Sequence, residues 1–204
     1  DDGSTVMLNT QTSVRIRYSG SERRVELLDG EAYFTVVRDS RPFLVDAGDA
    51  RLRSAQATFR VRKLADKPLD VLVDGGGVLL DRAGMPVPVT MRPNTHIALP
   101  LAAVDDAALV PRPVSPDLLS RELAWREGKI AFEGERLDEA AAAFARYSNT
   151  RIEIADPALA GEPITGLFAA SDPAGFSRAA ASIFGARIER RGDVVGLRRA
   201  GNAG

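Results

Sequence analysis

The chain has 204 residues, of which 45% are hydrophobic, and this suffices for one large or two small packed domains. Lys and Arg total 27 against 28 for Asp and Glu, and the resulting net charge of −1 argues against a dedicated binder of nucleic acid or anionic membranes. With no cysteine and one histidine, thiol nucleophiles, disulfides, Cys/His zinc sites and c-type haem attachment are excluded. No apolar run reaches the roughly 18 residues of a membrane helix, so we expect a soluble piece cut from a longer protein near Asp1.

Residues 5–99 alternate between apolar and polar side chains with the period of two that is typical of half-buried strands. The clearest examples are residues 14–18, 32–36 and 69–73. Turn sequences such as Asp29-Gly30 recur about every ten residues between them. We therefore predict that residues 1–100 form an all-β module, twisted and sandwich-like.

Prolines then interrupt a polar and Ala-rich stretch. Four prolines prevent a continuous helix there, namely Pro100, Pro111, Pro113 and Pro116. We therefore predict an extended, Pro-rich connector over residues 101–121 and place the domain boundary in it. A short helix or turn is expected over residues 118–125, leading into the second half of the chain.

The second half has a mixed rhythm of strands and amphipathic helices. The strands are expected at 129–132, 151–154 and 164–168, the helices at 137–147 and 172–184, and a hairpin at 186–197. Asp172-Pro173 is a suitable start for the second helix, and Gly185 a suitable end. Arg151-Ile152-Glu153 returns 36 residues later as Arg187-Ile188-Glu189, so we predict a small α+β module over residues 122–200 with two βα repeats.

Several residues of the types found in catalytic or ligand-binding sites have simple structural explanations in this sequence. Gly75-Gly76-Gly77 lacks the Lys-Ser/Thr of a phosphate loop and is expected to form a hairpin or bulge. The sequence around His96 contains no second histidine and no acidic cluster, and Asp46 and Asp49, which lack the spacing of a calcium loop, are expected to lie in turns. An enzyme acting on a glycan or peptide would need a pair such as Glu31 with Asp46, which the spacing does not require. We predict no catalytic residue, no cofactor and no metal.

Two features of the second half leave alternatives open. Trp125, the single tryptophan, either packs one half on the other or contacts a partner. Five arginines near the end of the chain either lie on solvated strand faces or meet an acidic patch of a partner. These arginines are Arg187, Arg190, Arg191, Arg198 and Arg199.

A binding module of this kind meets a protein partner through an exposed strand edge or an exposed apolar helix face. The candidate edge is the strand at 164–168, because Pro163 marks its start and Gly166 lets another backbone approach. The predicted partner-binding residues are Trp125, Ile164, Thr165, Gly166, Leu167 and Phe168.

Several motifs occur in an order that is typical of one family. VELLDGEAYF at 25–34, RPFLVDAG at 41–48 and Phe59-Arg60-Val61 together resemble the periplasmic part of FecR-type regulators. Residues 123–132 resemble the next landmark of that family. The C-terminal half is similar to the short N-terminal domain shared by secretins and TonB-dependent receptors, so the resemblance covers residues 2–199.

The resemblance implies a signal relay and not an enzyme. In this family an N-terminal cytoplasmic anti-sigma segment and one membrane helix precede a periplasmic sensor, and this chain would be the sensor of a single-pass inner-membrane protein. The sensor contacts the periplasmic signalling domain of an outer-membrane TonB-dependent transporter, usually for an iron-siderophore, and this leads to release of an extracytoplasmic-function sigma factor. The alternative is a structural or assembly module of an envelope complex.

One position departs from the family pattern. Many members carry Gly-Thr two residues before the Phe of a GTxFxV motif, and some are cleaved there by an N-to-O acyl shift. Gln56 and Ala57 occupy these positions here, so the hydroxyl nucleophile is missing and Thr58 is displaced by one residue. We therefore predict no self-cleavage between Gln56 and Ala57.

Overall fold

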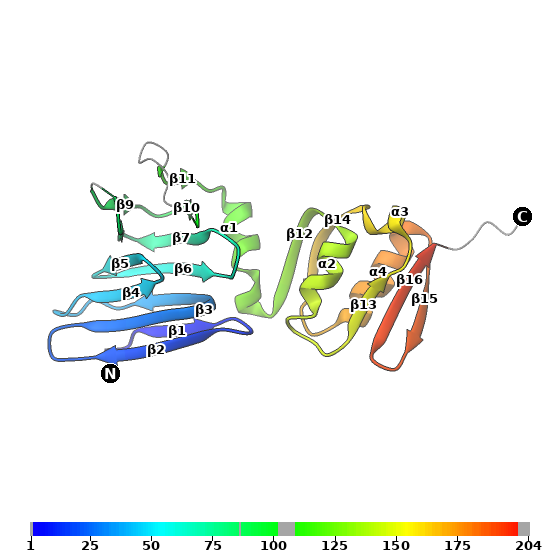
Figure 1. The fold of residues 1–204 in the computed structure, drawn as a ribbon, viewed down its shortest axis with the longest axis horizontal. Coiled ribbons are helices and arrows are strands. Elements are labelled where there is room, and N and C mark those ends of the chain that lie inside the picture. Colours follow the sequence, from blue (N-terminus) through cyan, green and yellow to red (C-terminus); the bar gives the residue numbers. More distant parts are fainter. Residues whose placement is uncertain (1, 86, 102–108, 200–204) are drawn as a thin grey trace, which may run out of the picture. The chain divides into compact units, whose positions relative to one another are not determined.

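The computed structural model describes residues 2–85, 87–101 and 109–199. Strands make up most of its regular structure and helices are few, which confirms the predicted predominance of β structure. The chain divides into two compact units, Asp1–Leu119 and Ser120–Gly204 (Figure 1). Across the described ranges, no helix combines the length and the apolar character needed to cross a membrane.

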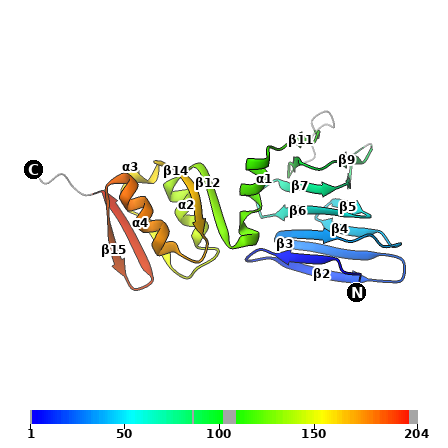
Figure 2. The ribbon, with the colours of Figure 1, turned by 180° about the vertical axis from the view of Figure 1, so that it is seen from behind.

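Unit 1 contains one eleven-stranded sheet, in which β1 and β2 both pair with β3 beside the main path β11-β10-β7-β6-β3-β4-β5-β8-β9. The strands are β1 (Thr5–Leu8), β2 (Ser13–Tyr18), β3 (Arg23–Val36), β4 (Phe43–Ala47), β5 (Ala50–Ser54), β6 (Ala57–Lys63), β7 (Leu69–Gly76), β8 (Val78–Arg82), β9 (Val89–Met91), β10 (Thr95–Leu99) and β11 (Arg112–Pro113). The sheet is seen from opposite sides in Figures 1 and 2.

The long strand β3 is shared by two halves of this sheet. Its first part pairs with β4 on one side and β2 on the other, and its second part pairs with β6 and β1. Between the two parts Gly30 has φ 97°, and a Cβ added there would lie 2.4 Å from Thr12 Oγ1. The prediction of a turn at Asp29-Gly30 is therefore wrong, because β3 continues through Gly30 and the chain does not reverse there.

A single apolar core joins the two halves of the sheet. Phe34 of β3 stacks on Phe59 of β6 with ring centroids 5.0 Å apart, and it meets Phe43 of β4 edge-on at 6.1 Å. Because β6 and β4 belong to different halves, these rings hold the halves together across the core. Aromatic pairs of this kind contribute about 0.5–1.5 kcal/mol beyond the area they bury.

The predicted connector, residues 101–121, is described in part, since residues 102–108 lie outside the described ranges. Beyond that gap, β11 pairs with the start of β10, and the helix α1 (Pro116–Glu122) follows. A short 3₁₀ helix, η2 (Ala124–Glu127), ends at Gly128, which has φ 69°.

Unit 2 consists of two small sheets and two main helices. Its elements are β12 (Lys129–Arg136), α2 (Leu137–Phe144), β13 (Arg151–Ile154), α3 (Pro157–Ala160), β14 (Pro163–Ala169), α4 (Pro173–Phe184), β15 (Ala186–Arg191) and β16 (Val194–Arg199). One sheet is the antiparallel pair β12-β14; in the other, β16 lies between the parallel β13 and the antiparallel β15. Helices α2 and α4 each pack against strands of both sheets (Figures 1 and 2).

Local signals define the ends of α4. The side chain of Asp172 accepts a hydrogen bond from the N–H of Gly175 at 2.7 Å, Pro173 is the first helical residue, and Gly185 ends the helix with φ 61°. All three roles were predicted. The hairpin β15-β16 also lies where it was expected. The short helix α3, capped by Asp156, was not predicted.

Four phenylalanines form the centre of the unit 2 core. The ring of Phe176, on α4, lies 4.6 Å from Phe144, 5.0 Å from Phe168 and 5.9 Å from Phe132, as measured between centroids. These partners belong to α2, β14 and β12. Phe176 therefore links one helix to the other helix and to both strands of the smaller sheet.

Unit 1 also buries a cluster of charged side chains. Arg60 of β6, with 1% of its side chain exposed, contacts Asp70 of β7, and its Nη1 lies 3.4 Å from Glu31 Oε1 of β3. The carboxylate of Asp70 lies 2.6 Å from Nε2 of His96 and 3.7 Å from Nη2 of Arg62. Positive and negative groups thus compensate each other inside the fold, as buried charges require.

We expect the stability of unit 1 to fall as the pH drops through the pKa of Asp70 in the folded protein. Burial raises this pKa, but the hydrogen bond with His96 and the charges of Arg60 and Arg62 outweigh burial and hold it below its usual value. A carboxyl group whose pKa is lowered by folding stabilises the protein above its unfolded pKa, and the contribution disappears as the pH falls through the folded pKa.

Urea unfolding measured at several pH values between about 5 and 2 tests this expectation. The wild-type protein should lose stability over this range, and Asp70→Asn should lose less because position 70 no longer titrates. Equal pH dependence of the two proteins would contradict the assignment to Asp70.

Candidate functional site

Residues 164–168, the core of the predicted partner-binding set, lie together on β14. Within the described ranges, β12 is the one strand that pairs with β14. An edge strand presents a row of backbone N–H and C=O groups that can pair with another chain. The structure therefore gives the predicted residues one common element with an available edge.

The side chains of β14 alternate between the two faces of its sheet. Ile164 and Phe168 pack into the unit 2 core, whereas Leu167 points to the opposite face and is 55% exposed. Thr165 shares that opposite face, where Leu167 lies across from Ala131 of β12. The outer face thus combines a large exposed aliphatic side chain with small neighbours.

A hollow of about 240 Å³, called here the β14 hollow, opens beside Leu167. Its walls come from β12, from β14 and from the segment that leads into β12. The lining residues are Ser120, Arg121, Ala124, Glu127, Lys129, Ala131, Phe132, Glu133, Thr165, Gly166 and Leu167.

The charges around the β14 hollow are paired with each other. Glu127 lies 2.8 Å from Lys129, whose ammonium lowers the pKa of the Glu127 carboxyl. Arg121 forms a second ion pair with Glu133. Because each cation has a carboxylate beside it, the hollow offers a neutral environment that suits an apolar side chain.

Gly166 has a packing role within unit 2. A Cβ added at this position would lie 2.9 Å from Cε2 of Phe168, whose ring packs against Phe176. The space over Gly166 is thus occupied by a ring of the same strand. A partner backbone would reach β14 along its edge and not across the face at this glycine.

Trp125 lies apart from the β14 hollow. It belongs to η2, and although its neighbours Ala124 and Glu127 line the hollow, Trp125 does not. Its indole Nε1 is buried and has no hydrogen-bond acceptor among the described residues. Packing and partner contact both stay predictions for this side chain.

The carboxylates weighed as a catalytic pair have separate surroundings. Glu31 is buried beside Arg60, whereas Asp46 binds two arginines on the outer face of β4, Arg24 at 2.8 Å and Arg51 at 2.7 Å. In the part of the chain that the structure describes, no three His, Cys, Asp or Glu side chains are grouped so as to hold a metal ion.

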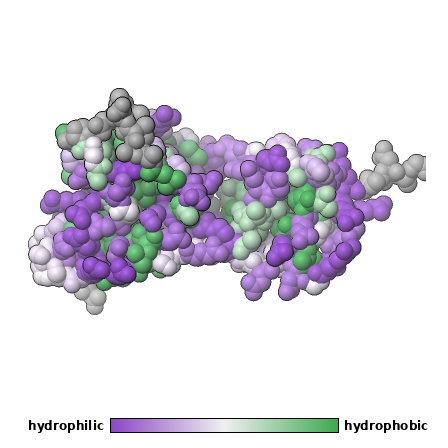
Figure 3. All heavy atoms as spheres, in the orientation of Figure 1, coloured by the Kyte–Doolittle hydropathy of each residue, from purple (hydrophilic) through white to green (hydrophobic). Residues whose placement is uncertain are grey.

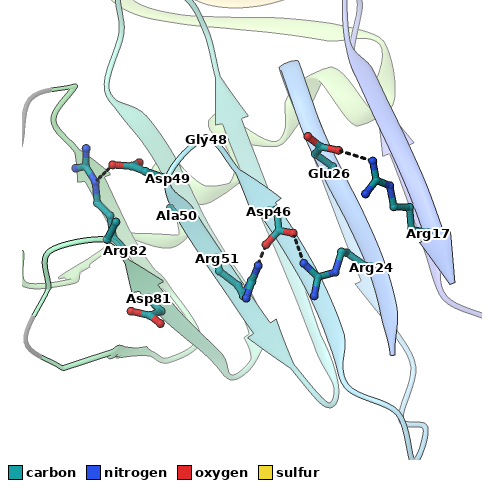
Figure 4. A pocket seen from close by; sticks show the side chains of 11 residues that line it. Arg17, Arg24, Glu26, Asp46, Gly48, Asp49, Ala50, Arg51, Asp81 and Arg82 are labelled. Carbon is teal, nitrogen blue, oxygen red and sulfur yellow. Dashed lines mark hydrogen bonds and ion pairs between the residues drawn. The ribbon is translucent and has the colours of Figure 1, made fainter. Parts of the chain in front are cut away.

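A second, polar hollow of about 430 Å³ opens on the outer face of unit 1 (Figure 4). Charged side chains from five strands form a row across it. They are Arg17 of β2, Arg24 and Glu26 of β3, Asp46 of β4, Arg51 of β5, and Asp81 and Arg82 of β8. Asp46 lies on β4 and not in the expected turn, and the row itself was not predicted. The signal available in the sequence was the occurrence of charged residues at alternate positions of neighbouring strands.

The surface seen in Figure 3 is mostly hydrophilic, with hydrophobic residues in small separate groups. Exposed apolar side chains that can anchor a partner are therefore local features, as Leu167 is on β14.

Comparisons with known proteins agree with this architecture. Residues 1–79 match the family model described as FecR protein. Two crystal structures of a candidate anti-sigma factor from Parabacteroides distasonis ATCC 8503, at 1.65 Å and 2.50 Å resolution, share the fold of the chain with a TM-score of 0.69 each. They are 24% and 23% identical to it; each match covers 98% of this chain, and 92% and 91% of the solved chains. No curated protein matches the sequence significantly.

Proposed function

We propose that this chain, whose residues 1–79 match the FecR family model, is the periplasmic sensor of an anti-sigma regulator in cell-surface signalling. In this proposal the sensor reads the state of an outer-membrane TonB-dependent transporter, usually one for an iron-siderophore. It passes that state through protein contact to an extracytoplasmic-function sigma factor, which is bound by a cytoplasmic part of the regulator.

The fold shared with a candidate anti-sigma factor over 98% of the chain supports this function. The site that we assign to the transporter's periplasmic signalling domain is the edge of β14 together with the β14 hollow. The observation that carries the assignment is that β14 is an edge strand of seven residues with no charged side chain.

Edge strands in native proteins are usually protected by charges, bulges or short length. In unit 2, β13 has four residues, β15 carries four charged side chains, and β12 is charged and has a register shift between Glu133 and Glu135. β14 has none of these protections, and its one proline, Pro163, is confined to its first residue. Its edge is thus the best suited of the four to accept a strand from a partner.

The β14 hollow supplies a place for a side chain of that strand. Leu167 is exposed at the wall of the β14 hollow. The charged residues of the hollow form two ion pairs, Glu127–Lys129 and Arg121–Glu133, so a partner side chain need not carry a charge to neutralise them. We expect a contact formed by main-chain hydrogen bonds and apolar burial, which salt affects little.

The function and the site are tested by titration calorimetry of the whole chain with the periplasmic signalling domain of a TonB-dependent transporter that is encoded by a neighbouring gene. One-to-one saturable binding is expected, and Leu167→Asp should weaken it about tenfold or more, because a charge would replace a buried apolar anchor. Ile188→Asp is the matched control: Ile188 is also exposed, at 41%, but lies on β15.

Three other outcomes would each overturn part of the proposal. Equal losses in Leu167→Asp and Ile188→Asp would show that β14 is not the site. Binding that Leu167→Asp leaves unchanged would move the contact elsewhere on the chain. Absence of binding at high micromolar concentrations would favour a structural or assembly module of an envelope complex.

A further inference from the structure

Unit 1 has an available strand edge of its own, at β2. Residues 13–18 pair on one side with β3, and no other strand of the described ranges pairs with them. The strand has six residues, which is long enough to template a further strand.

One face of β2 presents apolar side chains that the core does not fully cover. Val14 packs against the unit 1 core, but Ile16 is 60% exposed and Tyr18 43% exposed. The Tyr18 ring meets Phe43 edge-on, with centroids 6.4 Å apart. The core therefore continues past β2 as a partly uncovered apolar rim, which an added strand would cover.

The opposite face of β2 is positively charged. Arg15 and Arg17 have 51% and 64% of their side chains exposed, and β2 has no acidic residue. Both use the same carboxylate: Glu26 Oε2 lies 2.8 Å from Arg15 Nη1 and 3.9 Å from Arg17 Nη2. Arg17 lies directly across from Arg24, another cation. Figure 4 shows the side chain of Arg17 directed to Glu26 and that of Arg24 to Asp46.

The shared carboxylate leaves a deficit of negative charge at this edge. Arg24 contacts two carboxylates, those of Glu22 and Asp46, each at 2.8 Å, although Asp46 also binds Arg51. Glu26, by contrast, is shared by the guanidinium groups of Arg15 and Arg17, and its distance of 3.9 Å from Arg17 is long for an ion pair. An additional carboxylate beside Arg17 would complete the row of alternating charges.

We propose that β2 is a strand-addition site for an extended segment of another protein, in which acidic side chains alternate with apolar ones. The apolar side chains would cover Ile16 and Tyr18, and the acidic ones would lie beside Arg15 and Arg17, as cross-strand pairs of opposite charge do. This site is separate from the β14 edge and lies in the other unit.

The same charges act against pairing with a second copy of the chain. Two β2 strands that keep their apolar faces together must place an arginine of one opposite an arginine of the other, at positions 15 or 17. Like charges directly opposite are destabilising. The edge therefore selects an acidic strand over a copy of itself.

The test is a titration of the whole 204-residue chain with a synthetic octapeptide in which glutamate alternates with valine, followed by amide hydrogen exchange. Protection is expected at residues 13–18, and a peptide with lysine in place of glutamate should give none. Reversing Arg17 in Arg17→Glu should weaken binding about fivefold to tenfold, with a strong dependence on salt. The double variant Arg15→Glu/Arg17→Glu should no longer bind the glutamate peptide and should bind the lysine peptide instead.

Arg53→Glu is the matched control, because Arg53 is exposed on β5, which is paired on both sides by β4 and β8. It should keep the wild-type affinity. Equal effects of Arg17→Glu and Arg53→Glu would reduce the interaction to general charge attraction and overturn the proposal. Protection at residues 163–169 in place of 13–18, or no protection at millimolar peptide, would overturn it as well.

Discussion

Replacing Arg60 by methionine should destabilise unit 1 by about 3–5 kcal/mol, the usual cost of leaving buried charges without their partner. Arg60 is 1% exposed, and its removal would take the buried guanidinium group away from two carboxylates, those of Glu31 and Asp70. Asp70 would keep His96 and Arg62 beside it, so most of the cost is expected at Glu31. Asn9 donates a hydrogen bond to Glu31 at 2.6 Å, but a neutral amide cannot replace a guanidinium group.

Urea unfolding followed by far-UV circular dichroism measures this loss. Arg53→Met removes an arginine from an exposed position of the same sheet and should change the stability by no more than about 0.5 kcal/mol. The triple variant Arg60→Met/Glu31→Gln/Asp70→Asn should recover part of the loss, since it removes the stranded charges together with the arginine. A cost for Arg60→Met close to that of Arg53→Met would show that the cluster is hydrated and not buried.

Features that depend on neighbouring residues could be read from the sequence. Asp172, Pro173 and Gly185 define the ends of α4 through contacts within a few residues, and the structure has them in those roles. The hairpin β15-β16 is equally local, because Gly192 lies in the turn that joins its strands.

Features that depend on distant residues could not be read in this way. The glycines at 75–77 were expected in a hairpin or bulge. The pairing of β6 with β7 does shift register beside Gly75, between Thr58 and Phe59. The hairpin is absent, because β7 pairs with β6 and β10, whereas β8 pairs with β5 and β9. The chain therefore crosses from one half of the sheet to the other at this point. Alternation of side chains assigns residues to a face and says nothing about which strands become neighbours.

The two strand edges show the same limit on predicting a site. Residues 164–168 were selected from Pro163 and Gly166, yet an edge position follows from pairing partners that lie far away in the sequence. For β2 the alternation of Ile16 and Tyr18 with Arg15 and Arg17 indicates two distinct faces, but not that Ile16 is 60% exposed. Only the arrangement of β1, β2 and β4 around β3 decides which strand ends the sheet.

Replacing Phe176 by alanine should destabilise unit 2 by about 3–5 kcal/mol, the range observed when a buried phenylalanine is truncated in a packed core. Phe176 is 1% exposed and contacts three other phenylalanines, so the cavity would open at the meeting point of two helices and two strands. Ile183→Ala, on the same helix but 61% exposed, should have a small effect.

The separate cores of the two units decide how this variant should unfold. Because the residues of each core come from one unit alone, Phe176→Ala should shift the transition of unit 2 and leave that of unit 1 in place. Hydrogen exchange resolved along the chain distinguishes the two transitions, with faster exchange expected in residues 129–199. Since Phe176 supports Phe168 on β14, binding of the transporter's signalling domain should weaken as well, while peptide binding at β2 should not change. Loss of both kinds of binding, that of the signalling domain and that of the peptide, would show that the two units fold as one.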